Sequence, residues 1–170
     1  MVNIDLRDKT ILITGGAGGI GAQTALSLAK LGANIVLSDI DDDAAQVTMG
    51  HLIETGAKAL YVHTDVSDVE QVSALFTQAV EAFGRIDVVL NNAGVEYAPT
   101  PTHLTDDDLF LTNIDINLKG VWYCVKAALN IMLAQKGGQI INVASVAGLR
   151  SAPLISGYSA TKHAVVGLTK

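Results

Sequence analysis

The stretch Thr14-Gly15-Gly16-Ala17-Gly18-Gly19-Ile20-Gly21 joins an apolar run, residues 10–14, to an amphipathic run, residues 20–31. The first run predicts a buried strand, and the second predicts a helix that Gly32 ends. A glycine-rich turn between a strand and a helix is typical of dinucleotide-binding units, although a merely flexible loop is the alternative. Gly15 permits a tight turn, and Gly19 and Gly21 allow the backbone to approach a pyrophosphate on exposed N–H groups. We assign Gly18 and Ile20 to the same site.

Short apolar runs and amphipathic runs continue to alternate after this turn. Strand-helix alternation with apolar strands predicts an α/β domain: a Rossmann-like, doubly wound parallel sheet with helices on both faces. Ser67 and Glu70 form a capping box, Thr105 is expected to cap a long helix, and Gly120 marks a possible irregularity in it. The predicted strands are 34–39, 59–63, 86–91 and 139–144, and the predicted helices are 42–54, 67–83, 105–134 and one from about 157.

Composition narrows the class of protein. The chain has 170 residues, of which 49% are hydrophobic, and this is enough for one domain over residues 1–170. A formal net charge of −6 argues against a nucleic-acid partner. The single Cys124 and four scattered histidines predict neither a disulfide nor a metal site. The absence of a signal-peptide core and of a long apolar run predicts a cytoplasmic protein with no membrane partner.

Acidic residues follow the second and third predicted strands. Asp39 stands eighteen residues after Gly21, where a carboxylate can accept hydrogen bonds from an adenosine ribose 2′-OH and would repel a 2′-phosphate. Its neighbour Ile40, which we assign to the same site, offers no cation to bind that phosphate. The sequence therefore favours NAD over NADP. Asp65 and Val66 follow the third strand and are expected near the adenine, although a simple loop carboxylate is equally compatible with this pattern.

The fourth predicted strand ends in Asn91-Asn92-Ala93-Gly94. Ligands bind at the carboxyl edge of open α/β sheets, so Asn91, Ala93 and Gly94 are expected to line the cofactor cleft. An ordinary turn is the alternative, because asparagine and glycine favour turns in any protein.

Tyr158 and Lys162 are four residues apart on a predicted helix, and Ser145 lies thirteen residues before Tyr158. Residues at this spacing share a helix face, so the ammonium can lie beside the phenol. An ordinary phenol, with a pKa of about 10, exchanges protons poorly near neutrality, and a fixed cation favours its phenolate form. The pair thus indicates a general acid/base, and Ser145 is placed to hold a substrate oxygen.

Taken together, these motifs resemble the short-chain dehydrogenase/reductase family of the simple, single-domain type. The resemblance implies reversible hydride transfer between NAD(P) and a secondary alcohol or ketone. It makes Tyr158 the proton donor and acceptor, Lys162 the cation that also holds the nicotinamide ribose, and Ser145 the residue that orients the substrate. Asn117 would anchor a water molecule that relays protons. The family also implies a homo-oligomer built on the helices that carry Asn117 and Tyr158.

Compared with that family, the chain is expected to be C-terminally incomplete, with five strands present and the last two missing. This leaves open a dinucleotide-binding fragment without turnover, a 3-oxoacyl thioester reductase, and an epimerase or dehydratase with the same Tyr-Lys pair. The remaining cleft loops favour an apolar or cyclic alcohol as the substrate. Their residues of interest are Tyr97, Leu149, Pro153, Leu154 and Ile155.

Overall fold

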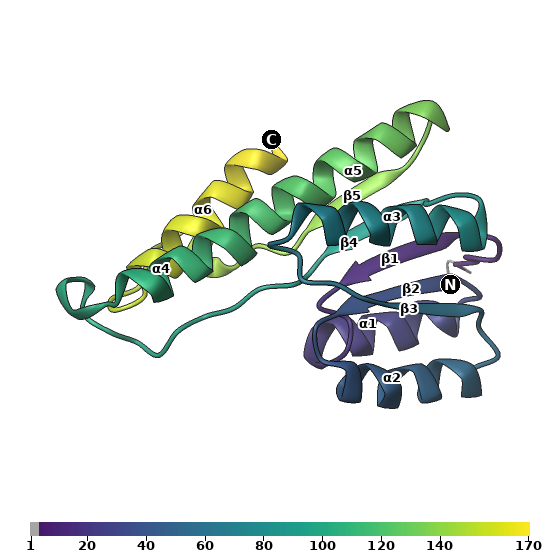
Figure 1. The fold of residues 1–170 in the computed structure, drawn as a ribbon, viewed down its shortest axis with the longest axis horizontal. Helices are drawn as coiled ribbons and strands as arrows, with labels where there is room; N and C mark the ends of the chain where they lie inside the picture. Colours follow the sequence, from purple (N-terminus) through teal and green to yellow (C-terminus); the bar gives the residue numbers. More distant parts are fainter. Residues whose placement is uncertain (1–3) are drawn as a thin grey trace.

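The computed structural model describes residues 4–170 and contains one five-stranded parallel sheet (Figure 1). The strand order is β3-β2-β1-β4-β5, so the chain adds strands in one direction and then reverses beside β1. This is the doubly wound topology that the alternation predicts. The strands are β1 Thr10–Thr14, β2 Asn34–Asp39, β3 Ala59–His63, β4 Val88–Asn91 and β5 Gln139–Asn142.

Helices cover both faces of the sheet. Helices α1 and α2 pack on one face, and α3 and α5 pack on the other (Figure 1). Helix α6 lies against α4 and the segment that joins α4 to α5. The helices are α1 Gly19–Ala29, α2 Asp42–Glu54, α3 Val69–Phe83, α4 Asp107–Ile114, α5 Val121–Ala134 and α6 Ser156–Thr169, with short 3₁₀ turns at Thr102–Leu104 and Val146–Gly148.

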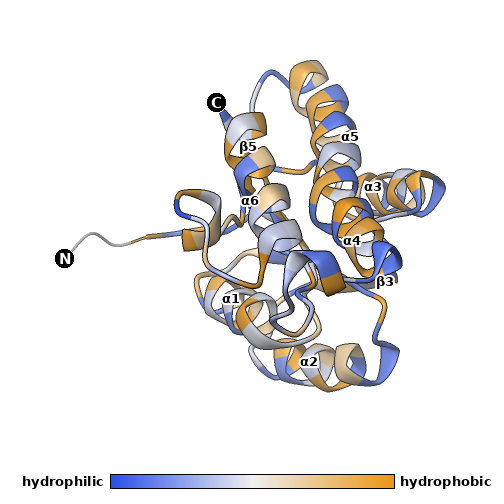
Figure 2. Ribbon diagram, turned by 90° about the vertical axis from the view of Figure 1, so that its left-hand side faces the viewer, coloured by the Kyte–Doolittle hydropathy of each residue, from blue (hydrophilic) through white to orange (hydrophobic). Residues whose placement is uncertain are grey.

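Strands β1 to β4 each contribute to two apolar cores because successive side chains point to opposite faces. In β1, Ile11 and Ile13 pack with α1 and α2, whereas Leu12 packs with α3 and α5. All three side chains are almost completely buried. Figure 2 looks onto the carboxyl ends of the strands and shows both apolar and polar residues on each covering helix. The apolar sides of these helices supply the second half of each core.

The predicted elements are confirmed, with corrections at their ends. The cap of α3 is Asp68 and not Ser67, because the Asp68 carboxylate accepts the N–H groups of Glu70 and Gln71 while the Ser67 hydroxyl donates to Asp65. Helix α4 likewise uses a neighbour of the predicted cap. There the Asp106 carboxylate accepts the N–H of Asp108, and the hydroxyl of Thr105 donates to the carbonyl of Pro101 instead.

Three elements are also shorter than predicted. Helix α1 ends at Ala29, since the chain turns through Gly32 at a φ of +93°. Strand β4 begins at Val88, because the backbone of Ile86 bonds to the side chain of Gln135. Strand β5 ends at Asn142, and the next carbonyl, that of Val143, accepts the Lys162 ammonium.

The irregularity expected near Gly120 is a π-helical segment, Asp115–Gly120, between α4 and α5. Such segments are rare and are frequent at functional sites. Gly120 is the last residue of this segment and lies against Val66. A Cβ on Gly120 would lie 2.7 Å from Cγ2 of Val66, so this residue lets the helix approach the loop after β3.

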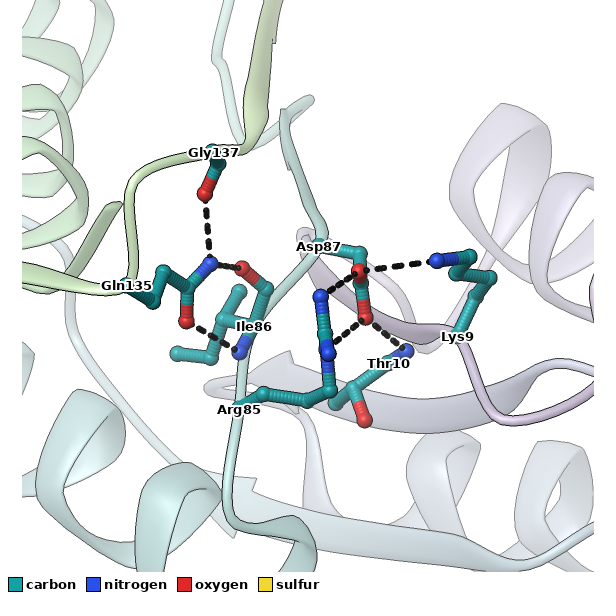
Figure 3. A network of polar contacts seen from close by, with 7 residues as sticks. All are labelled: Lys9, Thr10, Arg85, Ile86, Asp87, Gln135 and Gly137. Carbon is teal, nitrogen blue, oxygen red and sulfur yellow. Dashed lines mark hydrogen bonds and ion pairs between the residues drawn. The ribbon is translucent and has the colours of Figure 1, made fainter. Parts of the chain in front are cut away.

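The amino ends of the strands are joined by a polar network (Figure 3). The Asp87 carboxylate accepts the backbone N–H of Thr10 at 3.0 Å and pairs with Arg85 and Lys9. The Gln135 amide binds both backbone groups of Ile86. These bonds fasten β1, β4 and the end of α5 together. No helix within residues 4–170 is long and apolar enough to cross a membrane.

Candidate active site

A cleft of about 450 Å³ opens at the carboxyl ends of β1 to β4. It lies where the strand order reverses between β1 and β4, which is the place where open α/β sheets bind ligands. The turns after all four strands contribute to its wall. The lining residues are Gly15, Ala17, Gly18, Ile20, Asp39, Ile40, Asp41, Ala44, Thr64, Asp65, Val66, Asn92, Ala93, Gly94, Val95 and Ile116.

The glycines of the first turn fall into two groups that differ in their surroundings. A Cβ on Gly21 would collide with the carbonyl oxygen of Gly15, and a Cβ on Gly15 would lie 2.7 Å from Cα of Ala93. These two residues therefore let the loop fold onto itself and onto the end of β4. By contrast, a Cβ on Gly18 or Gly19 would meet open space. Gly18 is the N-cap of α1 and no side chain caps that helix, so its first N–H groups suit an anionic ligand.

The peptide of Ala17 is held from both sides. Its N–H donates to Oδ2 of Asp39 at 2.9 Å, and its carbonyl accepts the buried hydroxyl of Thr48 at 2.7 Å. Asp39 also accepts the N–H groups of Ile40 and Asp41 through Oδ1. Asp39 thus fixes the glycine-rich turn and faces the cleft, where a carboxylate can still accept from a ribose hydroxyl.

Asp65 and Val66 lie on the same side of the cleft as Ile40. Val66 is buried and Ile40 is exposed. Apolar side chains from two loops can therefore contact a flat aromatic ring in the cleft. The Asp65 carboxylate accepts the N–H and the hydroxyl of Ser67, and its own N–H donates to Gln71. Asp65 is therefore both a loop carboxylate and a residue of the cleft wall.

The end of β4 divides its asparagines between two environments. Asn91 is buried behind the cleft, where its amide donates to Asn142 at 2.8 Å, and it is not among the lining residues. Asn92, which the sequence places in the motif but which we did not assign to the cleft, lines the cleft and donates to the carbonyls of Thr14 and Gly15. Ala93 and Gly94 line the cleft as expected.

Asn117 is completely buried in the π-helical segment. Its amide oxygen accepts the N–H of Val95 and its amide nitrogen donates to the carbonyl of Val95, each at 2.8 Å. The same nitrogen donates to Asn113 and lies 3.4 Å from the hydroxyl of Thr161 on α6. Asn117 therefore connects the cleft wall to the helix that carries Tyr158.

Lys162 is 4% exposed and lies next to the cleft. Its ammonium donates to the carbonyl of Val143 at 2.9 Å, lies 5.7 Å from the centre of the Tyr158 ring, and would be 3.5 Å from a Cβ on Gly94. Burial lowers the pKa of this ammonium from its ordinary value. The ammonium lies over the Tyr158 ring at a distance typical of a cation–π contact.

Ser145 reaches the same region through the turn that follows it. Its hydroxyl oxygen accepts the N–H of Ala147 at 3.1 Å, which leaves the hydroxyl proton free to donate. A Cβ on Gly148 would lie 2.6 Å from the carbonyl oxygen of Lys162, so the turn packs directly on α6. Tyr158 is half-buried one helical turn before Lys162. The turn that follows Ser145 therefore packs on the helix that carries Tyr158 and Lys162.

Several residues of the site were missed from sequence. Thr48 bonds to the carbonyl of Ala17, and Gly148 packs on the carbonyl of Lys162. Neither contact can be predicted from a local sequence pattern. Tyr97, expected in a substrate loop, is instead buried with its hydroxyl bonded to Gly157. Across residues 4–170, no three histidine, cysteine, aspartate or glutamate side chains gather in a way that would hold a metal ion.

The sequence profile of the short chain dehydrogenase family matches residues 9–170. The chain belongs to this family. Levodione reductase from Leifsonia aquatica is 42% identical over 165 residues, which are 96% of this chain and 62% of that protein. A 2,5-dichloro-2,5-cyclohexadiene-1,4-diol dehydrogenase from Sphingobium indicum is 39% identical over 98% of this chain and 66% of its own length.

Solved structures of the family superpose closely on this short-chain dehydrogenase chain. Levodione reductase matches with a TM-score of 0.94. An NAD⁺-bound xylitol dehydrogenase also matches with a TM-score of 0.94 at 35% identity, over 96% of this chain and 63% of that one. The chain thus spans somewhat less than two thirds of the length of these relatives.

Proposed function

We propose that the protein is an oxidoreductase that transfers a hydride between a nicotinamide cofactor and a secondary alcohol or ketone. One observation carries the proposal: the Lys162 ammonium lies both beside the Tyr158 ring and behind Gly94 in the wall of the cleft. The acid/base pair therefore adjoins the place where a dinucleotide fits. Relatives that are named as reductases and dehydrogenases support the same chemistry.

The proposed roles follow from the contacts. In reduction, the Tyr158 hydroxyl gives its proton to the carbonyl oxygen of the substrate, and in oxidation the phenolate takes the hydroxyl proton back. The buried Lys162 ammonium stabilises that phenolate. Ser145 donates its free hydroxyl proton to the substrate oxygen and fixes its position. The cofactor, when bound, supplies or takes up the hydride.

The glycine-rich turn and Asp39 are proposed to hold NAD in preference to NADP. The uncapped start of α1 suits a pyrophosphate, and no side chain on Gly18 or Gly19 blocks the approach. Beside the same turn, Asp39 and Asp41 line the cleft and are proposed to face the adenosine ribose. These charges accept a 2′-OH and repel a 2′-phosphate.

Replacement of Asp39 tests this cofactor assignment. Asp39→Asn keeps an oxygen for the N–H of Ala17 but removes the charge, so the preference for NAD over NADP should fall by about tenfold, as expected for the loss of one close charge repulsion. The measurement is kcat/KM with each cofactor. Asp43→Asn makes the same change of charge on α2, outside the cleft lining, and should leave the ratio alone. An unchanged ratio in Asp39→Asn would remove Asp39 from cofactor choice.

The protein is proposed to work in the cytoplasm. Its proposed substrate class is a cyclic secondary alcohol. The name of the Sphingobium relative specifies a cyclohexadiene diol, and Leu149 and Leu154 expose apolar side chains on the loop after Ser145. The first experiment incubates the natural protein with NADH and cyclic ketones, and with NAD and cyclic alcohols, while NADH absorbance is followed. Turnover supports the proposal. The absence of both turnover and NADH binding would contradict it.

A second candidate is a dinucleotide-binding protein without turnover. The cleft, with its glycine-rich turn and Asp39, is built from β1 to β4 and does not depend on the catalytic helix for its lining. Tight NADH binding by fluorescence, with no oxidation of it by any ketone of the panel, would favour this candidate over the oxidoreductase.

We also propose self-association through α4 and α5. Large apolar side chains on these helices are exposed, among them Leu111 at 52%, Trp122 at 47% and Leu133 at 74%. Apolar surface gathered in this way is typical of protein interfaces. Light scattering of the natural protein tests the proposal, and a monomeric mass at micromolar concentration would contradict it.

A further inference from the structure

Helix α6, which carries Tyr158, begins without a cap of its own. The residue before its first turn is Ile155, whose φ of −126° and ψ of 39° lie outside the extended region and whose side chain makes no capping bond. The first N–H groups of any helix have no partner within the helix. Most helices satisfy them with a local serine, threonine or aspartate, and isoleucine has no acceptor to offer.

Tyr97 supplies the missing acceptor from a segment sixty residues earlier in the chain. Its hydroxyl oxygen accepts the backbone N–H of Gly157 at 2.9 Å, and the Tyr97 side chain is only 7% exposed. Gly157 has to be bare for this contact, because a Cβ there would lie 2.9 Å from the hydroxyl and 2.9 Å from Cδ2 of Phe110. The buried phenol thus caps the first turn of α6.

Two further bonds tie the same segments together. The N–H of Thr100 donates to the carbonyl of Leu154 at 2.8 Å, and the hydroxyls of Thr102 and Ser156 lie 3.0 Å apart. Leu154 has a φ of +69°, a conformation that costs a non-glycine residue energy and persists only where its surroundings hold it. We call residues 95–102 the clasp segment.

The clasp segment is fixed at its other end by Asn117, which binds both backbone groups of Val95. It therefore runs from the cleft wall to the start of α6. Tyr97 itself is not among the residues that line the cofactor cleft. Its hydroxyl therefore contacts α6 and is not placed to touch a dinucleotide in the cleft.

We propose that Tyr97 is a positioning residue that holds the first turn of α6, and with it the phenol of Tyr158, against Lys162. The inference rests on the proposed function, because the position of the phenol matters only if Tyr158 is the acid/base. Gly157 directly precedes Tyr158, whereas Lys162 is anchored independently by the carbonyl of Val143. Release of the first turn therefore moves the phenol relative to a fixed ammonium.

Tyr97→Phe in the natural protein tests the proposal, since it keeps the buried ring and removes only the acceptor. We expect kcat with NAD and the best cyclic alcohol of the panel to fall by roughly 3- to 30-fold, the effect of losing one helix cap. The KM for NAD should stay unchanged. Hydrogen exchange of the backbone amides at 156–160 should become severalfold faster, which reports the cap without any turnover.

Tyr123→Phe is the matched control, because it removes a half-buried phenol hydroxyl from α5, in a groove lined by α3 and α5 with no residue of α6. It should alter neither kcat nor exchange in α6. Unchanged exchange at 156–160 in Tyr97→Phe, or an unchanged kcat, would overturn the proposal. A loss of NAD affinity in proportion to kcat would also overturn it, because that result indicates general damage. A wild-type protein without turnover would refute the proposed function, while faster exchange would still establish the cap.

Discussion

The two ends of the parallel sheet use polar groups in opposite ways. At the amino ends of the strands, Asp87 pairs with Arg85 and Lys9 and accepts the N–H of Thr10, while Gln135 bonds to the backbone of Ile86 (Figure 3). At the carboxyl ends, Asp39 and its neighbours hold the loops but also face a cleft of about 450 Å³. One end uses its charged and amide side chains in bonds within the protein, and the other leaves acceptors and donors that face a cleft.

This difference teaches which substitutions should damage stability and which should damage function. Polar groups that are satisfied inside the protein contribute to folding, because removal of one partner leaves the other buried and unpaired. Groups that face a cleft are held in place by the fold and retain unused bonding capacity. Substitutions at the two ends should therefore separate stability from activity, and the following three test that separation.

The largest effect is expected from Tyr158→Phe at the carboxyl end. The change removes the proton donor and leaves the ring in place, so turnover should fall by about 10²- to 10⁴-fold, the usual contribution of a general acid/base. The affinity for NADH, measured by fluorescence titration, should change by less than about twofold, because most single contacts contribute little to binding. Retained turnover would exclude Tyr158 from the chemistry. It would also contradict the expectation that substitutions at the carboxyl ends of the strands damage function.

Gly21→Ala should have the next largest effect. The added methyl group would collide with the carbonyl oxygen of Gly15 and approach Nδ2 of Asn92 to 2.8 Å, so the glycine-rich turn has to move. Overpacking of this kind costs about 1–3 kcal/mol, and NADH affinity should fall by roughly 10- to 100-fold as a result. The measurement is the Kd for NADH.

Gly50→Ala is the matched control for that change. Gly50 lies in α2 and a Cβ there meets nothing within 4 Å, so the same methyl group should stabilise the protein by about 0.5–1 kcal/mol and leave NADH affinity unchanged. Equal effects of the two substitutions would show that the turn tolerates side chains at Gly21 and that the comparison fails there.

Asp87→Asn should show the smallest effect, and at the opposite end of the sheet. Burial opposes the charge of Asp87, but hydrogen bonds from Thr10 and Arg85 and the charges of Arg85 and Lys9 outweigh it and lower the pKa of the carboxyl. A carboxyl with a lowered pKa in the folded state stabilises the fold fully above the unfolded pKa of about 3.9 and loses that contribution as the pH falls through the folded pKa.

The variant should therefore lose about 1–2 kcal/mol of unfolding free energy at pH 7, the worth of a charge-assisted hydrogen bond. The gap between wild type and variant should shrink as the pH falls below about 4. Urea unfolding at both pH values measures this, with NADH affinity at pH 7 as the readout from the other end. A gap that grows toward acid, or a weakened NADH affinity, would contradict the assignment.

The sequence predicts the sheet well, because strands that are buried on both faces leave a continuous apolar signal. Thr10–Thr14, Asn34–Asp39 and Ala59–His63 begin and end where the pattern indicates. Ends that depend on a side chain from elsewhere are predicted less well. Gln135 shortens β4 from 49 residues away, and Lys162 shortens β5 by binding Val143.

The candidate site divides in the same way. The types of residue that carry chemistry, such as Tyr158 and Lys162, are read from local spacing because one helix face holds both. The difference between Asn91 and Asn92 is not, because Asn91 ends β4 and bonds to Asn142 on the neighbouring strand, whereas Asn92 begins the loop and bonds to the glycine-rich turn. Tyr97 was misassigned because its partner, Gly157, lies sixty residues away.

The strand order also has a consequence for how the chain is made. Strand β1 has β2 on one side and β4 on the other, and the bond from Asn92 to the carbonyl of Thr14 joins residues 78 apart. During synthesis at about 5–20 residues per second, β1 to β3 therefore wait several seconds for the strand that closes their inner edge. For that interval the nascent chain exposes the unpaired side of β1, and this edge is the surface that ribosome-bound chaperones would have to shield.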